Sequence, residues 1–232
     1  MPEIRTNSSK EKYWEKFTKR YKTKYPIAFR LFREYGLLPE SEGWTNIVRH
    51  CLIEAAAMEV IADELNLSTK DKDKLVLAGL VHDFYKRQEL ELIIKEGDST
   101  TSLEKAEEES AQILLRHKID PDVVKITDAI GITKLDRIKD PSCTLSEKIM
   151  FYIDSITKHD EIVSLEDKVA ELPSRYPDIA KTGIYPVYLK VAQGVEAELA
   201  AKMGLENPAG LPSYIKQRVF GDIIKEHKTE AE

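Results

Sequence analysis

The stretch that decides the fold is residues 75–86, Leu-Val-Leu-Ala-Gly-Leu-Val-His-Asp-Phe-Tyr-Lys. A cap-like start at residues 68–71 precedes this run, and helical spacing continues to Phe84 and Tyr85. The run therefore predicts a helix buried on nearly all sides, rather than a strand. His82 and Asp83 follow the apolar residues directly, where an unpaired charge would be costly. We expect a partner for Asp83 nearby.

Apolar residues recur at helical spacing between clusters of Pro and Gly along the rest of the chain, which predicts an all-α fold. Residues 46–65 form a mostly apolar stripe that begins at a candidate N-cap, Asn46. Within this stripe, Ala55, Ala56 and Ala57 are small enough to let a neighbouring helix come close. Such an approach is expected where two helices share a site.

Two further helix starts carry the capping-box pattern, in which Thr and Glu side chains satisfy free backbone N–H groups. They begin at Thr101 and at Thr144, each with Glu three residues later. The second start predicts a helix over roughly 145–159, with Asp154 beside its apolar face. An acid against a core face requires an explanation.

Composition limits the class of protein. The chain has 232 residues, of which 42% are hydrophobic, and 35 Lys and Arg against 41 Asp and Glu give a net charge of −6. This balance does not favour wholesale binding to nucleic acid or to an acidic membrane. Cys51 and Cys143 stand outside any CxxC motif, so neither a disulfide scaffold nor a structural zinc site is expected. The start of the chain has no apolar leader and no stretch is long enough to span a bilayer, so we expect a cytoplasmic protein.

The first part of the chain differs in charge from the rest. Residues 10–33 hold nine Lys or Arg and two Glu, interleaved with aromatic residues. One interpretation is binding of a nucleotide or single-stranded nucleic acid by stacking and charge. We prefer the other, in which Tyr13, Phe17 and Tyr21, spaced by four, form the buried side of an amphipathic helix.

His50 and Asp154 are the natural partners for the His82-Asp83 pair. Each lies on a predicted helix next to an apolar face, so two nitrogens and two carboxylates could converge on one ion. Taken singly, each residue has a plainer explanation: a hydrogen-bonded structural histidine, or an ion pair between Asp154 and Lys158 one turn on. The joint pattern favours the ion.

The arrangement His50, His82-Asp83 and Asp154 resembles the signature of the HD-domain superfamily of metal-dependent phosphohydrolases. Residues 78–86, Ala-Gly-Leu-Val-His-Asp-Phe-Tyr-Lys, are similar to the family's motif, and residues 145–156 resemble the segment before its last Asp. The resemblance covers about residues 44–160. It implies an HD-domain-like helical bundle, one divalent metal held by these four residues, and hydrolysis of a small phosphorylated substrate, with a nucleotide as the first expectation.

The chemistry agrees with these residue types. Two imidazoles and two carboxylates hold Mn²⁺, Fe²⁺, Ni²⁺ or Zn²⁺ more readily than Mg²⁺. Metal coordination can lower the pKa of water from 15.7 to about 7, which would supply the attacking group. Asp83 could also accept a proton. Lys86, three residues later on a continuing helix, would steer the anionic substrate, unless it is a solvated surface lysine.

The sequence departs from the two-metal members of the family. Where they carry additional histidines, this chain has Ala106 and Thr133. His117 lies between these positions but falls at a helix end, where a capping role is expected. A single metal is therefore expected, and the oxygenase branch, which needs two irons, is disfavoured. We assign no role to His159 and His227, which are expected to be exposed.

Three segments are expected: an N-terminal basic and aromatic helical segment (1–43), the metal-binding core (44–160), and a C-terminal helical extension (161–232). The extension would cover the site or form a subunit interface in a homo-oligomer. The alternative to an enzyme is a ligand-binding or regulatory module that keeps the metal site without turnover.

Overall fold

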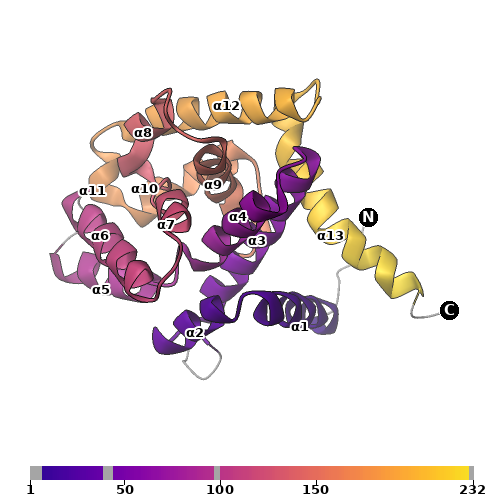
Figure 1. Ribbon diagram of the computed structural model, residues 1–232. Helices are drawn as coiled ribbons and strands as arrows, with labels where there is room; N and C mark the ends of the chain where they lie inside the picture. Colours follow the sequence, from indigo (N-terminus) through magenta and orange to yellow (C-terminus); the bar gives the residue numbers. More distant parts are fainter. Residues whose placement is uncertain (1–6, 39–43, 97–99, 230–232) are drawn as a thin grey trace.

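The computed structural model describes residues 7–38, 44–96 and 100–229. Over these ranges the protein is all-α, as predicted, with one short hairpin (Figure 1). The helices are α1 (Asn7–Lys24), α2 (Pro26–Glu34), α3 (Thr45–Glu64), α4 (Thr69–Val81), α5 (Lys86–Glu96), α6 (Thr100–Arg116), α7 (Pro121–Thr127), α8 (Leu135–Lys139), α9 (Leu145–Ile156), α10 (Leu165–Arg175), α11 (Pro177–Ala180), α12 (Ile184–Lys202) and α13 (Leu211–Thr229). Strands β1 (Thr157–Lys158) and β2 (Glu161–Ile162) pair antiparallel, and two 3-10 turns are η1 (Ile132–Lys134) and η2 (Pro208–Gly210).

Helices α3, α4 and α9 pack against one another at the centre of the molecule (Figure 1). Helices α10 and α12 pack on α9, while α13 returns to α3. At the N-terminal end of the chain, α1 contacts α3 and α2 contacts α4. The segments expected to flank the core are therefore in direct contact with its helices, although the division at residues 43 and 160 stays a prediction.

Gly79 on α4 allows α3 and α4 to approach closely. A Cβ atom at this position would lie 2.7 Å from Sδ of Met58 and 3.2 Å from the backbone nitrogen of Ala55. Ala55, Ala56 and Ala57 are all buried on the facing helix. The small-residue stripe of α3 thus admits a neighbouring helix, as the sequence predicted.

We expect Gly79→Ala to destabilise the fold by about 1–3 kcal/mol, because overpacking would push the two helices apart. Urea unfolding measures the change in the free energy of unfolding. Gly194→Ala on α12 is the control, because an added Cβ there meets no atom within 4 Å. A helical Gly→Ala change at an open position is expected to be neutral or stabilising by up to about 1 kcal/mol. Equal effects of the two substitutions would contradict the role of Gly79.

Two predicted helix starts are found in the structure and two are displaced. The Ser68 side chain caps α4, and Thr144 forms a complete capping box with Glu147 at the start of α9. Helix α3 begins earlier than expected, because the N–H of Ile47 already bonds to the carbonyl of Trp44, so Asn46 is not its cap. Helix α6 already includes the residue before Thr101, so the capping box predicted there does not form the start.

Helix α4, which leads to His82 and Asp83, ends sooner than expected. Helix α4 stops at Val81, residues 82–85 form a turn, and α5 begins at Lys86. The turn buries Phe84 completely, with its ring edge-on to that of Tyr35 at a centroid distance of 4.9 Å. The prediction that Lys86 continues the same helix is therefore wrong: the turn, and not helical periodicity, sets its direction.

The aromatic side of α1 packs on the core. Phe17 and Tyr21 are buried, whereas the side chain of Tyr13 lies outside the described residues. Between them, Arg20 forms a 2.7 Å ion pair with Glu59 of α3. For Phe17 and Tyr21 the structure confirms the amphipathic interpretation.

Cys51 and Cys143 are both buried as free thiols. Among the helices of the described ranges, none combines the length and the apolar character needed to cross a bilayer.

Candidate metal centre

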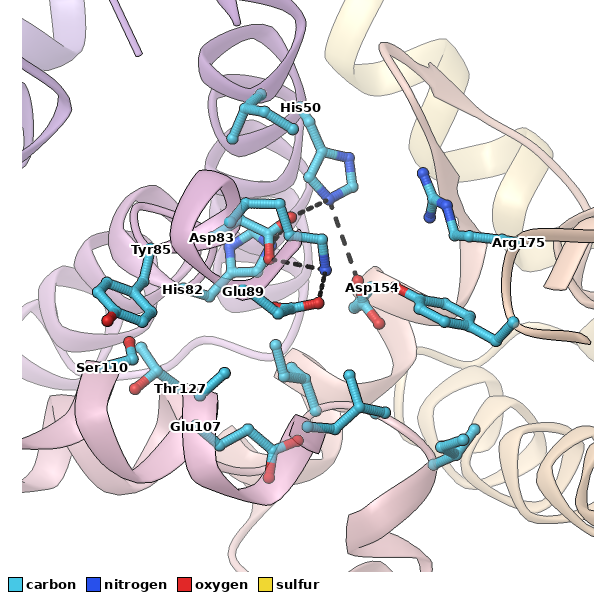
Figure 2. Close-up of a pocket in the computed structure, with 18 of the residues that line it drawn as sticks. His50, His82, Asp83, Tyr85, Glu89, Glu107, Ser110, Thr127, Asp154 and Arg175 are labelled. Carbon is cyan, nitrogen blue, oxygen red and sulfur yellow. Dashed lines mark hydrogen bonds and ion pairs between the residues drawn. The ribbon is translucent and has the colours of Figure 1, made fainter. Parts of the chain in front are cut away.

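His50 of α3 is held so that its Nε2 atom is available as a ligand (Figure 2). Its other ring nitrogen, Nδ1, lies 2.9 Å from the main-chain oxygen of His159. A carbonyl oxygen only accepts hydrogen bonds, so Nδ1 carries the proton and Nε2 keeps its lone pair. Burial lowers the pKa of His50 to about 3, so the ring is neutral at physiological pH.

His82 is fixed in the same way at the C-terminal end of α4. Its Nδ1 lies 2.9 Å from the carbonyl oxygen of Gly79, one turn earlier. The Nε2 atom therefore also keeps its lone pair, and this buried atom has no hydrogen-bond partner among the described residues. Two buried imidazoles thus present lone pairs to one small volume, with 5.3 Å between their ring centroids.

Asp83 and Asp154 complete the set that the sequence predicted. Oδ2 of Asp83 lies 3.7 Å from Nε2 of both histidines, and Oδ1 of Asp154 on α9 lies 4.0 Å from Nε2 of His50. Figure 2 shows these groups facing one another from α3, from the turn after α4 and from α9. The structure brings the four residues together, although Asp83 falls outside the group of donor atoms that all lie within 4.8 Å of one another. Their role as metal ligands stays a prediction.

Glu54 is a member of the cluster that the sequence reasoning missed. It lies one helical turn after His50 and is 0% exposed. Its Oε1 lies 3.1 Å from Nε2 of His50, and its Oε2 lies 3.3 Å from Nε2 of His82. The available signal was an ionisable residue four positions after a candidate ligand, on an otherwise apolar helix face.

The donor set fits a divalent cation. One ligand atom each from His50, Glu54, His82 and Asp154 lie within 4.8 Å of one another. Both oxygens of Glu54 lack a hydrogen-bond donor in the described part of the chain, an arrangement that is costly for a buried carboxylate. Burial, reinforced by Asp154 and Asp83, raises the pKa of Glu54 well above its usual range. A cation of charge +2 would satisfy these donors, and nitrogen with oxygen ligands suits first-row transition metals.

Lys86 faces the cluster despite the break in the helix. Its Nζ lies 2.8 Å from Oε1 of Glu89 and 3.8 Å from Oδ1 of Asp83. Burial opposes the charge on Lys86, but the carboxylates of Asp83 and Glu89 raise its pKa well above the usual range. Burial likewise opposes the charge on Asp83, but Lys86 and the two histidines lower the pKa of Asp83 below its usual range. The side chain is 16% exposed, so Lys86 is not a solvated surface lysine.

The cluster lies at one end of a cavity lined by α5, α6, the end of α7, α10 and α12 (Figure 2). Ala106 and Thr133, the positions at which the family resemblance led us to look for a second pair of histidines, are both near this cavity. Ala106 lines it, and the Thr133 hydroxyl donates a 3.0 Å hydrogen bond to Glu107. Within the described ranges, the group around His50 is the one cluster of metal-binding side chains.

Two of the remaining histidines, His117 and His159, have contacts in the structure. His117 follows α6, and its Nε2 lies 3.6 Å from Oε2 of Glu34. The His159 side chain is half exposed, but its main-chain oxygen orients His50. Because any residue type could supply a main-chain oxygen, the sequence does not predict this contact. The side chain of His227 lies outside the described residues.

The fold and the cluster define a class of protein: an all-α domain with a cluster of His, Glu, His and Asp side chains at one end of a cavity. Residues 47–172 match the HD domain. The match covers more than half of the chain, and the protein belongs to the HD domain family. No curated protein and no solved structure gives a significant match.

Proposed function

We propose that the protein is a metal-dependent phosphohydrolase that acts on a small phosphorylated molecule. The observation that carries this proposal is the buried Glu54 carboxylate, which has no hydrogen-bond donor in the described part of the chain, beside two imidazole lone pairs and Asp154 at a cavity with cationic side chains. Such a set has little structural value unless a cation is bound, because buried charges without partners destabilise a fold.

His50, Glu54, His82, Asp83 and Asp154 would hold the metal. When bound, a divalent ion lowers the pKa of water and offsets the charge that develops on phosphorus. The chain's own residues prepare the site: Gly79 and His159 fix both imidazole tautomers through their carbonyl groups, and Lys86 keeps Asp83 ionised. Proton acceptance by Asp83 and phosphate binding by Lys86 remain predictions.

A nucleotide is our first expectation for the substrate, and this preference comes from the family alone. The second candidate is a binding module without turnover. It is favoured by the expectation, drawn from the family resemblance, that Ala106 and Thr133 stand where two-metal members carry histidines.

Purified protein with 1 mM Mn²⁺ or Ni²⁺ is expected to hydrolyse p-nitrophenyl phosphate or members of a panel of nucleoside monophosphates. Released phosphate measures turnover. EDTA should abolish it, and restoring the metal should restore it. Activity that survives complete removal of metal would contradict the proposal. Tight nucleotide binding with no product would establish the binding module instead.

A further inference from the structure

Three Lys or Arg side chains line the cavity in the described part of the chain, and two of them are engaged by protein groups. Lys86 is held by Glu89 and Asp83. Lys168 on α10 is buried and donates to the main-chain oxygen of Thr157. Both contribute positive potential, but part of their hydrogen-bonding capacity is already used.

Arg175, at the end of α10, differs from both lysines. Its guanidinium makes no hydrogen bond and no ion pair within the described ranges, although it lines the cavity. The nearest acid on its own helix, Glu171, is already paired with Lys158 at 3.1 Å and with His159 at 3.5 Å. Figure 2 shows the guanidinium directed toward the His50 and Asp154 side of the cavity. The residue is exposed, so a planar group with five N–H donors is available to a ligand in the cavity that also contains the candidate metal centre.

We propose that Arg175 binds the phosphate group of the substrate and selects phosphomonoesters over phosphodiesters. The inference rests on the proposed function. A guanidinium binds phosphate best as a fork, through two parallel N–H to oxygen bonds. A monoester has three non-bridging oxygens, so one can face the cluster and two remain for Arg175. A diester has two non-bridging oxygens. If one faces the cluster, a single oxygen remains for Arg175, and the two parallel hydrogen bonds cannot both form.

The test uses the full-length protein with 1 mM Mn²⁺ and the variants Arg175→Gln and Arg175→Lys. Arg33→Gln on α2 is the matched control, because Arg33 is exposed, as Arg175 is, but does not line the cavity. Calorimetric titration with inorganic phosphate measures binding without turnover, and metal content is measured in parallel. Hydrolysis of p-nitrophenyl phosphate and of bis(p-nitrophenyl) phosphate compares a monoester with a diester.

Arg175→Gln is expected to weaken phosphate binding and to raise KM for the monoester by about 10- to 100-fold, the usual loss for hydrogen bonds to a charged group. Metal content should not change, and the rate on the diester should change less than threefold. Arg175→Lys should fall between the wild type and Arg175→Gln, because it keeps the charge and loses the fork. The control should match the wild type.

The outcomes separate this inference from the proposed function. Wild-type protein that binds no phosphate, or an Arg175→Gln variant that binds it as tightly as the control, overturns the inference even if the esters are hydrolysed. Full activity of Arg175→Lys, or a wild-type preference for the diester, overturns the selection of monoesters. If neither ester is hydrolysed, the proposed function fails, and the phosphate titration still decides whether Arg175 binds phosphate.

Discussion

Asp154→Asn is expected to release the metal and to reduce phosphatase activity by at least about a thousandfold, because the reaction would lose both activated water and charge stabilisation. Asp154 is the one member of the cluster that α9 supplies, so no neighbouring side chain on that helix can take its place. Asparagine keeps the size of the side chain but removes its negative charge. The fold should remain intact, because Asp154 is only partly buried.

Metal content after dialysis, together with phosphate release, measures both effects, and circular dichroism checks the fold. Asp136→Asn is the matched control, because this aspartate on α8 is 98% exposed and pairs with Lys139. A folded Asp154→Asn protein that retains a full equivalent of metal and its activity would refute the assignment of the centre.

Glu54→Gln should change stability and metal affinity in opposite directions. Without metal, the free energy of unfolding of the variant should be about 1–4 kcal/mol higher than that of the wild type. Burial raises the pKa of Glu54, so the wild type must either ionise this buried group without a partner or protonate it, and an amide carries neither cost. The new amide can also donate to an imidazole Nε2. With metal, affinity should fall by at least about tenfold, because one anionic donor is gone. A purely structural glutamate would instead lose stability and leave metal affinity unchanged.

Urea unfolding in EDTA and calorimetric titration with Mn²⁺ provide the two readouts. Glu196→Gln is the control: Glu196 is also a buried glutamate, but it accepts a 2.9 Å hydrogen bond from Tyr152 and is not a member of the candidate metal cluster. Its replacement should leave metal affinity unchanged. A loss of stability in metal-free Glu54→Gln would contradict the role of Glu54 as a metal ligand.

The sequence predicted the parts of the site that depend on side-chain chemistry and helical periodicity. His50, the His82-Asp83 pair and Asp154 stand out because polar groups beside apolar helix faces are costly, and these faces were readable from spacing. Glu54 does not stand out in the same way, because it lies within the mostly apolar stripe of residues 46–65. The turn over residues 82–85 is not predicted, because tertiary packing of Phe84 outweighs local helical spacing.

Other contributions depend on contacts between distant segments. The main-chain oxygen of His159 reaches His50 across 109 positions of sequence, and any residue type could supply that oxygen. Arg175 enters the cavity only because α10 folds back over α9, a packing that no local pattern predicts. The sequence therefore indicates the candidate ligands more readily than it indicates the groups that orient them.

The position of α10 also bears on the order in which the protein assembles during translation. Every candidate metal donor, from His50 to Asp154, leaves the ribosome before Lys168 and Arg175 do. Because nascent chains begin to fold from their N-terminal side, the donors can gather before the cationic side of the cavity has been synthesised. A chain truncated after residue 162 would carry all five candidate donors and neither of these two cations, so the candidate metal centre would form before the Arg175 side of the cavity exists.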